Sequence, residues 1–250
     1  MESIQTELNL DGLTFPEQEI GLTEPEKKVL NLIPLGKENA VSGSYICNLL
    51  DISSRHLTDQ ARRLRLKHYD VGSTTYDGYY RFLNPTEYLK FMNMLSRELT
   101  RSEQVIEAMR LTPMAQKITI DTNQMAIVQS GLDFHGLVFP NRETKLSELE
   151  KRLLSLIPLG KENMLTCAYI ANALDICTRH VKKLVRNLRL KHYDIGSTTD
   201  GGYYQFQTPM EYLEFMNKLS KELARSKQVM EAMSLTPMAR QIVIEANQTA

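Results

Sequence analysis

Apolar side chains recur at helical spacing along residues 26–33 and again along residues 42–50. Pro34 and Gly36 end the first pattern, because neither residue continues a helix well. Ser42 stands where a side-chain cap would begin the second helix. Two short helices are therefore predicted, the second with an apolar side formed by Ile46, Leu49 and Leu50.

A third helix is predicted over residues 54–67, after a break of three residues. Leu57, Ala61 and Leu64 follow one another at i, i+4 and i+7, which places them together on the inward side of this helix. Two helices joined by so short a turn form a helix-turn-helix. Residues 68–82 then contain two short runs of β-forming residues around the turn-rich sequence TYDG, a pattern typical of a β-hairpin. Three helices closed by a hairpin predict a winged helix.

A long helix is predicted next, over residues 85–110, and a short helix after it. One interpretation is that the long helix packs against the winged helix that precedes it. The other is that it joins a second chain or a partner protein, because its apolar stripe is longer than a small domain can cover. The stripe consists of Tyr88, Phe91, Met92, Leu95, Leu99, Ile106 and Met109.

The whole pattern occurs twice, at a constant offset of 124 residues. The sequence LIPLG begins at Leu32 and again at Leu156, and LTPMA begins at Leu111 and again at Leu235. Repeats of about 125 residues have the length of domains rather than of solenoid units. The predicted fold is mainly α with small β-hairpin wings, as an internal duplication. Residues 1–125 would contain a winged helix at about 24–83 and a long helix at 85–110, and residues 126–250 a winged helix at about 148–207 and a long helix at 209–234.

The sequences LIPLGKEN, ISSRHL, LRLKHYDVGSTT and GYY carry a resemblance to a known family. Residues 26–82 and 150–206 resemble the winged helix-turn-helix domains of phage and mobile-element proteins of Gram-positive bacteria. The tandem arrangement is similar, in architecture, to plasmid replication initiators built from two winged helices. This resemblance implies a DNA-binding protein whose third helices read the bases.

The distribution of charge indicates which part of the protein is expected to bind DNA. The formal net charge is zero, which argues against a protein that coats nucleic acid by bulk electrostatics. Positive charge is nevertheless concentrated on the third helices: residues 53–67 carry five Lys or Arg and one acid, and residues 177–191 carry no acid. The second repeat is therefore expected to hold phosphates more strongly.

The outer faces of the two third helices supply the predicted base contacts. Arg and Lys can donate to guanine, and Asp can accept from cytosine N4, so Asp59 opposite Lys183 predicts two unlike half-sites. The wing tips carry hydroxyls and no Lys or Arg, so phosphate contacts are expected there. The predicted DNA contacts are Ser54, Arg55, Thr58, Asp59, Arg62, Arg65, Ser73, Thr74, Thr178, Arg179, Lys182, Lys183, Arg186, Arg189, Ser197 and Thr198.

No pattern of a catalytic, cofactor or metal site is found, so a non-enzymatic protein is expected. His56 and His68 recur at residues 180 and 192 without Cys or acids at metal-ligand spacing. Tyr79 and Tyr80 fall in a predicted strand, where packing is the default and a nicking role in a nuclease or relaxase is the least favoured option. Apolar runs are too short to span a membrane and no export signal is present. An intracellular location is therefore expected, and the resemblance implies the cytoplasm of a bacterial host.

The predicted function is sequence-specific binding of double-stranded DNA, in a phage or plasmid regulator or a replication-origin binder. The two third helices would occupy successive major grooves, and the long helices could also join two chains as a homodimer. The alternative is a protein-interaction module that binds host or replisome proteins through the winged helices and the Met-rich long helices. The acidic first half, with 17 acidic against 14 basic residues, favours this alternative.

Overall fold

The computed structural model describes residues 20–74, 78–122 and 145–248. The segments GLTFP and GLVFP, which begin at residues 12 and 136, lie outside the described residues. The described part is mainly helical, with ten α-helices and two small three-stranded antiparallel sheets. The chain divides into two compact units: unit 1 contains residues 1–99 and 224–250, and unit 2 contains residues 100–223.

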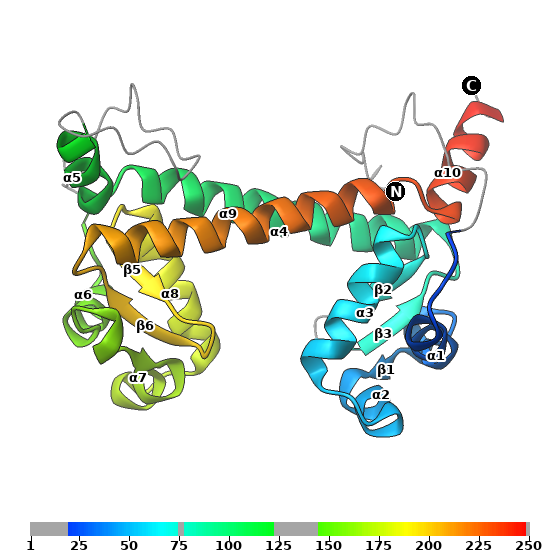
Figure 1. Cartoon of the computed structure of the whole chain (residues 1–250), viewed down its shortest axis with the longest axis horizontal. Helices are drawn as coiled ribbons and strands as arrows, with labels where there is room; N and C mark the ends of the chain where they lie inside the picture. The colour runs from blue at the N-terminus through cyan, green and yellow to red at the C-terminus, as the bar shows by residue number, and fades with distance from the viewer. Residues whose placement is uncertain (1–19, 75–77, 123–144, 249–250) are drawn as a thin grey trace. The chain divides into compact units, whose positions relative to one another are not determined.

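Unit 1 contains three helices and a sheet that follow one another along residues 24–81 (Figure 1). Strand β3 lies in the centre of the sheet, and both neighbours run antiparallel to it, with Val41 opposite Tyr79 and Gly72 opposite Tyr80. Strand β1 has only two residues, too few to produce an alternating pattern, and was not predicted. The elements are α1 (Glu24–Leu32), β1 (Val41–Ser42), α2 (Gly43–Leu50), α3 (Ser54–Leu66), β2 (Val71–Ser73) and β3 (Gly78–Arg81).

Local signals set the ends of the second and third helices. The Ser42 hydroxyl accepts a hydrogen bond from the Tyr45 N–H at 3.2 Å, and the Ser53 hydroxyl accepts one from the His56 N–H at 3.2 Å. Both are N-caps, which satisfy backbone donors that the first helical turn leaves unpaired. Helix α3 ends where His68 adopts a left-handed conformation, with φ of 65°. The chain then turns into β2.

The buried side of α3 is the predicted one, whereas that of α2 differs from the prediction. Leu57, Ala61 and Leu64 are at most 1% exposed. In α2, Ile46 is buried but Leu49 is 54% exposed, so the prediction for Leu49 is wrong. The buried neighbour of Ile46 is instead Cys47, because an eight-residue helix presents only about two turns to the core and Leu49 falls on the other side.

The same order of elements occurs in unit 2. The central strand is β6, with β4 and β5 antiparallel on its two sides. Val181, Val185 and Leu188 form the buried side of α8, as predicted. The elements are α6 (Glu148–Leu156), β4 (Leu165–Thr166), α7 (Cys167–Leu174), α8 (Thr178–Leu190), β5 (Ile195–Ser197) and β6 (Gly202–Gln205).

The two long helices cross the division between the units. Helix α4 (Pro85–Arg110) begins in unit 1 and ends in unit 2, and α9 (Pro209–Met233) begins in unit 2 and ends in unit 1. Residues 96–103 and 220–227 contain no Gly or Pro, so each helix continues without a break. The short helices that follow, α5 (Pro113–Thr122) and α10 (Pro237–Gln248), belong to units 2 and 1 respectively. The compact units therefore differ from the sequence repeats 1–125 and 126–250 by an exchange of their last helices.

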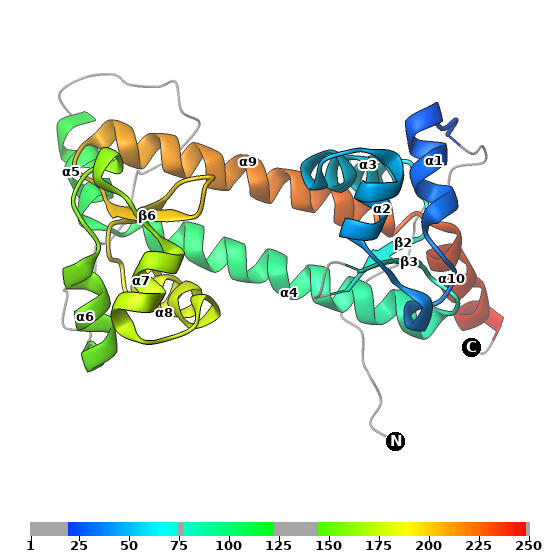
Figure 2. The ribbon, with the colours of Figure 1, turned by 90° about the horizontal axis from the view of Figure 1, so that it is seen from below.

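In unit 1 the exchanged part packs on the sheet and on the first turns of α4. Tyr80, Phe82, Tyr88, Phe91 and Met92 form one buried cluster together with Val229, Met233, Met238 and Ala239 from α9 and α10. Figure 2 shows α10 beside the start of α4. The first turns of the long helix pack on the winged-helix region that precedes them, as the first interpretation predicted. Its last turns pack on the region of the other repeat of the same chain, which neither interpretation predicted.

Candidate nucleic-acid interface

The outer face of α3 carries four of the predicted contacts at its exposed beginning. Ser54, Arg55, Thr58 and Asp59 are all exposed. The Thr58 hydroxyl donates to the backbone oxygen of Ser54 at 2.9 Å. An open cavity of about 240 Å³ lies on this face, lined by Ser53, Arg55, His56, Asp59, Gln60 and Arg63.

The corresponding face of α8 is more basic. Thr178, Arg179, Lys182 and Lys183 are exposed, and the helix contains no acidic residue. Where α3 has the carboxylate of Asp59, α8 has the ammonium group of Lys183. The two faces therefore differ in charge at the same helical position.

The next arginine on each helix lies partly inside its unit. Arg62 is half-buried and its Nη2 donates to Oε1 of Gln228 at 3.4 Å, and Arg186 is half-buried with Nη2 donating to Oε1 of Gln104 at 2.9 Å. Both glutamines belong to the exchanged ends of the long helices. Arg62 and Arg186 therefore connect the third helix of each unit to an exchanged helix, and only part of each guanidinium faces solvent.

The side chains of Arg65 and Arg189 point into their units, so these two predicted DNA contacts do not lie on the exposed faces of α3 and α8. Arg65 Nε donates to the backbone oxygen of Val71 at 2.9 Å, and its guanidinium lies 5.0 Å from the ring centroid of Phe91. Arg189 Nε donates to the backbone oxygen of Ile195 at 2.9 Å. Burial lowers the pKa of both guanidinium groups to about 10, so both remain charged at neutral pH. Arg65 and Arg189 therefore bond the third helix of each unit to the first strand of its hairpin.

Three of the four predicted hydroxyls of the hairpins accept hydrogen bonds within their own units. Ser73 Oγ accepts a hydrogen bond from Arg65 Nη2 at 3.1 Å. Thr74 Oγ1 accepts one from the Gly78 N–H at 3.0 Å, and Thr198 Oγ1 accepts one from the Gly202 N–H at 3.1 Å. Ser197 is half-buried at the end of β5. The hydroxyl oxygens are the acceptors in these bonds, so the bonds do not use the O–H donors that the predicted phosphate contacts require. The Thr198 hydroxyl itself donates to Met164 Sδ at 3.8 Å.

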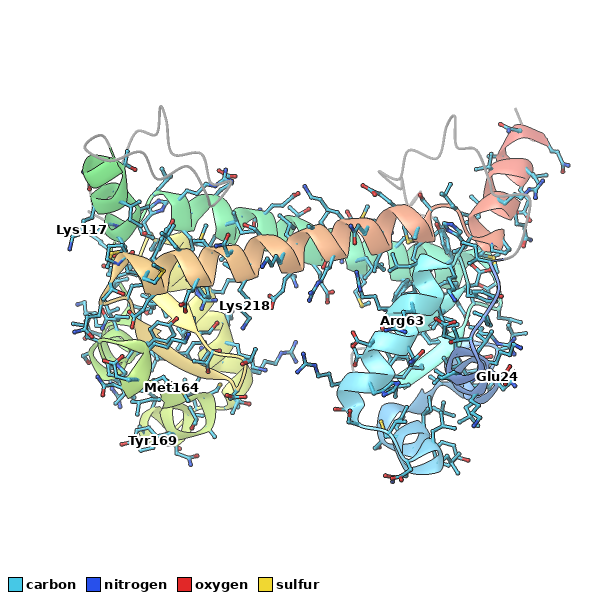
Figure 3. All side chains as sticks on the ribbon, viewed as in Figure 1. Glu24, Arg63, Lys117, Met164, Tyr169 and Lys218 are labelled. Atoms are coloured by element: carbon cyan, nitrogen blue, oxygen red, sulfur yellow. The ribbon has the colours of Figure 1, made fainter. Side chains whose placement is uncertain are left out.

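Several exposed side chains near these faces were not predicted as contacts. Arg63 is exposed and lines the cavity on α3. Tyr45 on α2 is 53% exposed and Tyr169, 124 residues later on α7, is 56% exposed. Figure 3 labels Arg63 on α3 and Tyr169 on the solvent side of α7. The sequence signal that could have identified this pair is the recurrence of tyrosine at residues 45 and 169, at the repeat offset of 124.

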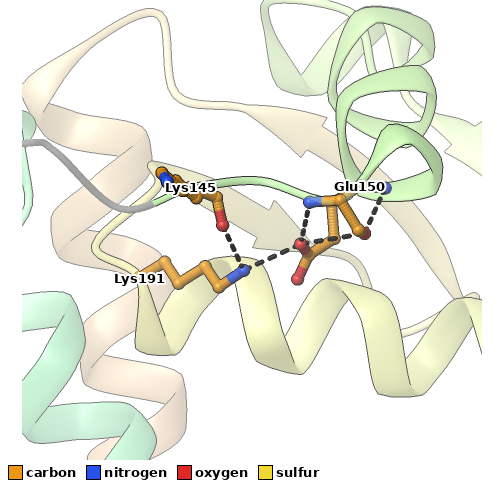
Figure 4. A network of polar contacts seen from close by, with 4 residues as sticks. Lys145, Glu150 and Lys191 are labelled. Carbon is orange, nitrogen blue, oxygen red and sulfur yellow. Dashed lines mark hydrogen bonds and ion pairs between the residues drawn. The ribbon is translucent and has the colours of Figure 1, made fainter.

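The last basic residue of each third helix region forms a buried ion pair instead of an exposed charge. Lys191 Nζ lies 2.7 Å from Oε2 of Glu150, which is 4% exposed, and it also donates to the backbone oxygen of Lys145 at 3.3 Å (Figure 4). Ser147 donates to the same carboxylate through its N–H at 2.8 Å. Burial acts to raise the pKa of Glu150, but the hydrogen bonds from Lys191 and Ser147 together outweigh it and hold the pKa below the ordinary 4.5. Unit 1 has the same pair between Lys67 and Glu26, at 2.6 Å.

A reactive tyrosine, a metal site or a membrane-spanning helix would indicate an enzyme or a membrane protein. Tyr80 and Tyr204 are 2% exposed, and burial raises the pKa of each to about 12. Among the described residues, no group of three or more His, Cys, Asp or Glu is placed to hold a metal ion. Over the same residues, no helix has the length and apolar character needed to cross a membrane.

One cap differs between the two third helices, and it leads to a prediction. Ser53 caps α3, whereas the matching Cys177 is exposed and caps α8 with no side-chain hydrogen bond. Cys177→Ser is expected to stabilise the protein by about 1 kcal/mol, because a hydroxyl would accept from the first turn of α8. Urea denaturation measures the change. Cys177→Ala is the control, since it removes the sulfur without adding an acceptor; an equal gain from both variants would contradict the capping argument.

Comparisons with family models, with curated proteins and with solved structures found no significant match to this chain.

Proposed function

We propose that the protein binds double-stranded DNA in a sequence-specific manner, as a phage or plasmid regulator or a replication-origin binder. The observation that carries this proposal is the face of α8, where Thr178, Arg179, Lys182 and Lys183 are exposed together on a helix without acidic residues. Helix α7 precedes it by a short turn and a β-hairpin follows it. Three helices closed by a hairpin are also what the resemblance to winged helix domains implies.

The chemistry of the two faces supports two different half-sites. On α8, Arg179 can donate two hydrogen bonds to guanine, while Lys182 and Lys183 can contact phosphates or guanine. On α3, Arg55 offers the same donors, but Asp59 can accept from cytosine N4 and repels phosphate. We therefore propose an asymmetric site, with more of the phosphate affinity supplied by unit 2.

Linking two modules in one chain has a physical consequence for affinity. Once one module is bound, the other is held near the DNA at an effective concentration in the millimolar range for a short linker. Two weak half-site contacts can then give the affinity of a dimer in a single chain of 250 residues. Each module alone is expected to bind weakly.

Arg179→Ala tests the proposed face of α8. Loss of a bidentate guanine contact is expected to weaken specific binding by about 1–3 kcal/mol, which corresponds to roughly 5- to 150-fold in Kd. The target duplex is obtained first, by selecting bound sequences from a random DNA pool with the purified protein. Fluorescence anisotropy then compares the variant with wild type on that duplex at two salt concentrations. The control is Arg152→Ala, which removes one exposed positive charge from α6 of the same unit.

Equal affinity of Arg179→Ala and wild type for the selected duplex would contradict the proposal that Arg179 on α8 contacts the bases. Cys177 provides an independent test, because it is exposed at the start of α8 whereas Cys47 is buried. Bound DNA is expected to slow the reaction of Cys177 with a maleimide reagent. Unchanged labelling in the presence of saturating DNA would place the DNA elsewhere on the protein.

A protein-interaction module is the second candidate, favoured by exposed apolar side chains on α2 and α7. Tyr45, Leu49 and Tyr169 are each more than half exposed, and aromatic residues of this kind are enriched in protein interfaces. Salt dependence separates the two candidates. DNA binding loses affinity steeply between low and moderate salt, because phosphate contacts release counterions. If selection enriches no duplex and no salt-sensitive binding is measured, the second candidate is favoured.

A further inference from the structure

The exchanged ends of the long helices make the same four polar contacts in both units. His68 Nδ1 donates to the backbone oxygen of Ala232 at 2.9 Å in unit 1, and His192 Nδ1 donates to that of Ala108 at 2.9 Å in unit 2. The Tyr88 hydroxyl donates to the backbone oxygen of Met233 at 3.0 Å. The Tyr212 hydroxyl donates to that of Met109, also at 3.0 Å. The third contact joins Arg62 to Gln228 in unit 1 and Arg186 to Gln104 in unit 2.

The fourth contact caps the short helix that follows. An Asp70 carboxylate oxygen accepts from the Met238 N–H of α10 at 3.2 Å, and an Asp194 oxygen accepts from the Met114 N–H of α5 at 3.2 Å. These N–H groups belong to the first turn of their helices, where no backbone partner is available. A residue between α3 and β2 of one repeat therefore caps a helix of the other repeat.

In each unit the contact joins two surfaces, a docking face and an end segment. The docking face of unit 1 is Arg62, His68, Asp70, Tyr88, Phe91 and Met92, and that of unit 2 is Arg186, His192, Asp194, Tyr212, Phe215 and Met216. The end segments are residues 104–118, which dock in unit 2, and residues 228–242, which dock in unit 1.

The six residues named for each docking face are the same in both units, and so are six of the inward positions of the two end segments. In residues 104–118 these six inward positions are Gln104, Val105, Ala108, Met109, Met114 and Ala115. Residues 228–242 carry the same six residue types at the same spacing. The end segments differ at one further packed position, where Ile106, 5% exposed, corresponds to Met230, and at exposed positions such as Lys117 against Gln241. The polar contacts are the same for both end segments.

We propose that each docking face accepts either end segment and that a second copy of this chain can supply it, so that two chains join by exchanging their end segments. A face without an end segment would expose the buried surfaces of Tyr88, Phe91 and Met92, all at most 2% exposed, which makes an unfilled face unstable. In the wild-type chain, the segment supplied from within has an effective concentration near the millimolar range, so the closed monomer dominates at micromolar protein. This proposal does not depend on DNA binding.

Two full-length variants with complementary defects test the proposal. Met233→Asp places a charge in the end segment at a position that is 0% exposed, and it leaves the docking face of unit 1 intact. Tyr88→Arg changes the docking face, also at a 0% exposed position, and leaves residues 228–242 intact. Unit 2 contains neither substitution. Each variant alone is expected to be a monomer, and the mixture is expected to form a heterodimer of twice 28.7 kDa by native mass spectrometry.

The matched control is the double variant Tyr88→Arg with Met233→Asp. Its residues 228–242 are defective and its residues 104–118 fill its own unit 2, so it must not pair with Met233→Asp. Heterodimers with the single variant and none with the double variant support the proposal. Monomers in every mixture, or equal pairing with the double variant, overturn it.

A second measurement needs no substitution and covers the case in which a variant does not fold. Wild-type chains labelled with ¹⁴N and ¹⁵N are unfolded together, refolded at high concentration and then diluted. Exchange of end segments during refolding is expected to trap dimers of mixed mass, which convert to monomers slowly because each conversion requires both segments to leave their faces. The absence of mixed dimers after refolding at high concentration overturns the proposal.

Discussion

Replacing Tyr212 with alanine is expected to destabilise unit 2 by about 3–5 kcal/mol, the cost of deleting a large buried aromatic side chain. Tyr212 is 0% exposed, its ring lies edge-on to Phe206 with centroids 5.4 Å apart, and its hydroxyl donates to Met109. The loss therefore combines a cavity with the loss of a contact to an exchanged helix. Urea denaturation measures the change in the free energy of unfolding.

Two control variants separate the contributions in this experiment. Tyr212→Phe keeps the ring and removes only the hydroxyl, so a cost of about 1 kcal/mol is expected. Tyr169→Ala removes a tyrosine that is 56% exposed in the same unit, and a change within about 0.5 kcal/mol is expected. Hydrogen exchange should also be faster in α5 of Tyr212→Ala than in wild type, because α5 follows the contact that is lost. An alanine variant as stable as the phenylalanine variant would contradict the burial argument.

Glu150→Gln is expected to destabilise unit 2 by about 3 kcal/mol at pH 7. The substitution leaves the Lys191 ammonium group beside a neutral amide, and removing one partner of a buried ion pair costs more than the pair contributes. Lys191 is 28% exposed at its side chain, which places the expected cost at the lower end of the usual range. Glu148→Gln is the control, because Glu148 forms an exposed pair with Lys151 in the same helix.

The same pair predicts a pH dependence with a definite sign. The pKa of Glu150 is lower in the folded protein than its ordinary value of 4.5, so the folded state favours the carboxylate. The stabilisation is fully present above pH 4.5 and is lost as the pH falls through the folded pKa. Glu26 has a lowered pKa for the same reasons, and it adds to the slope. In Glu150→Gln, the slope of stability against pH below 4.5 should be smaller than in wild type; an equal slope would contradict this assignment.

The elements themselves could be predicted from local patterns. The buried sides of α3 and α8 follow from apolar residues at i, i+4 and i+7, and the cap of α2 follows from Ser42. Patterns were insufficient where an element is short. Leu49 was assigned to the wrong side of an eight-residue helix, and the two-residue strand β1 has too few residues to alternate.

The candidate interface was predictable in part. The sequence places Arg55, Arg179 and Lys183 on outward positions, and they are exposed. It could not show that Arg65 and Arg189 turn inward, because their direction depends on the carbonyls of β2 and β5 and on the rings of Phe91 and Phe215, which lie far along the chain. A long flexible side chain at the edge of a helix face can follow either direction, and only its tertiary neighbours decide.

By itself, the sequence determined the order of the helices and hairpins, the length of the repeat and the buried sides of the third helices. Only the tertiary structure decided which repeat supplies the end segment to which docking face. The physical reason is that residues 104–118 and 228–242 present nearly the same inward side chains, with Ile106 against Met230 as the packed difference, so the polar contacts with either docking face have the same chemistry. The continuous backbone of α4 and α9, which Gly and Pro do not interrupt at residues 96–103 and 220–227, carries each segment into the other unit.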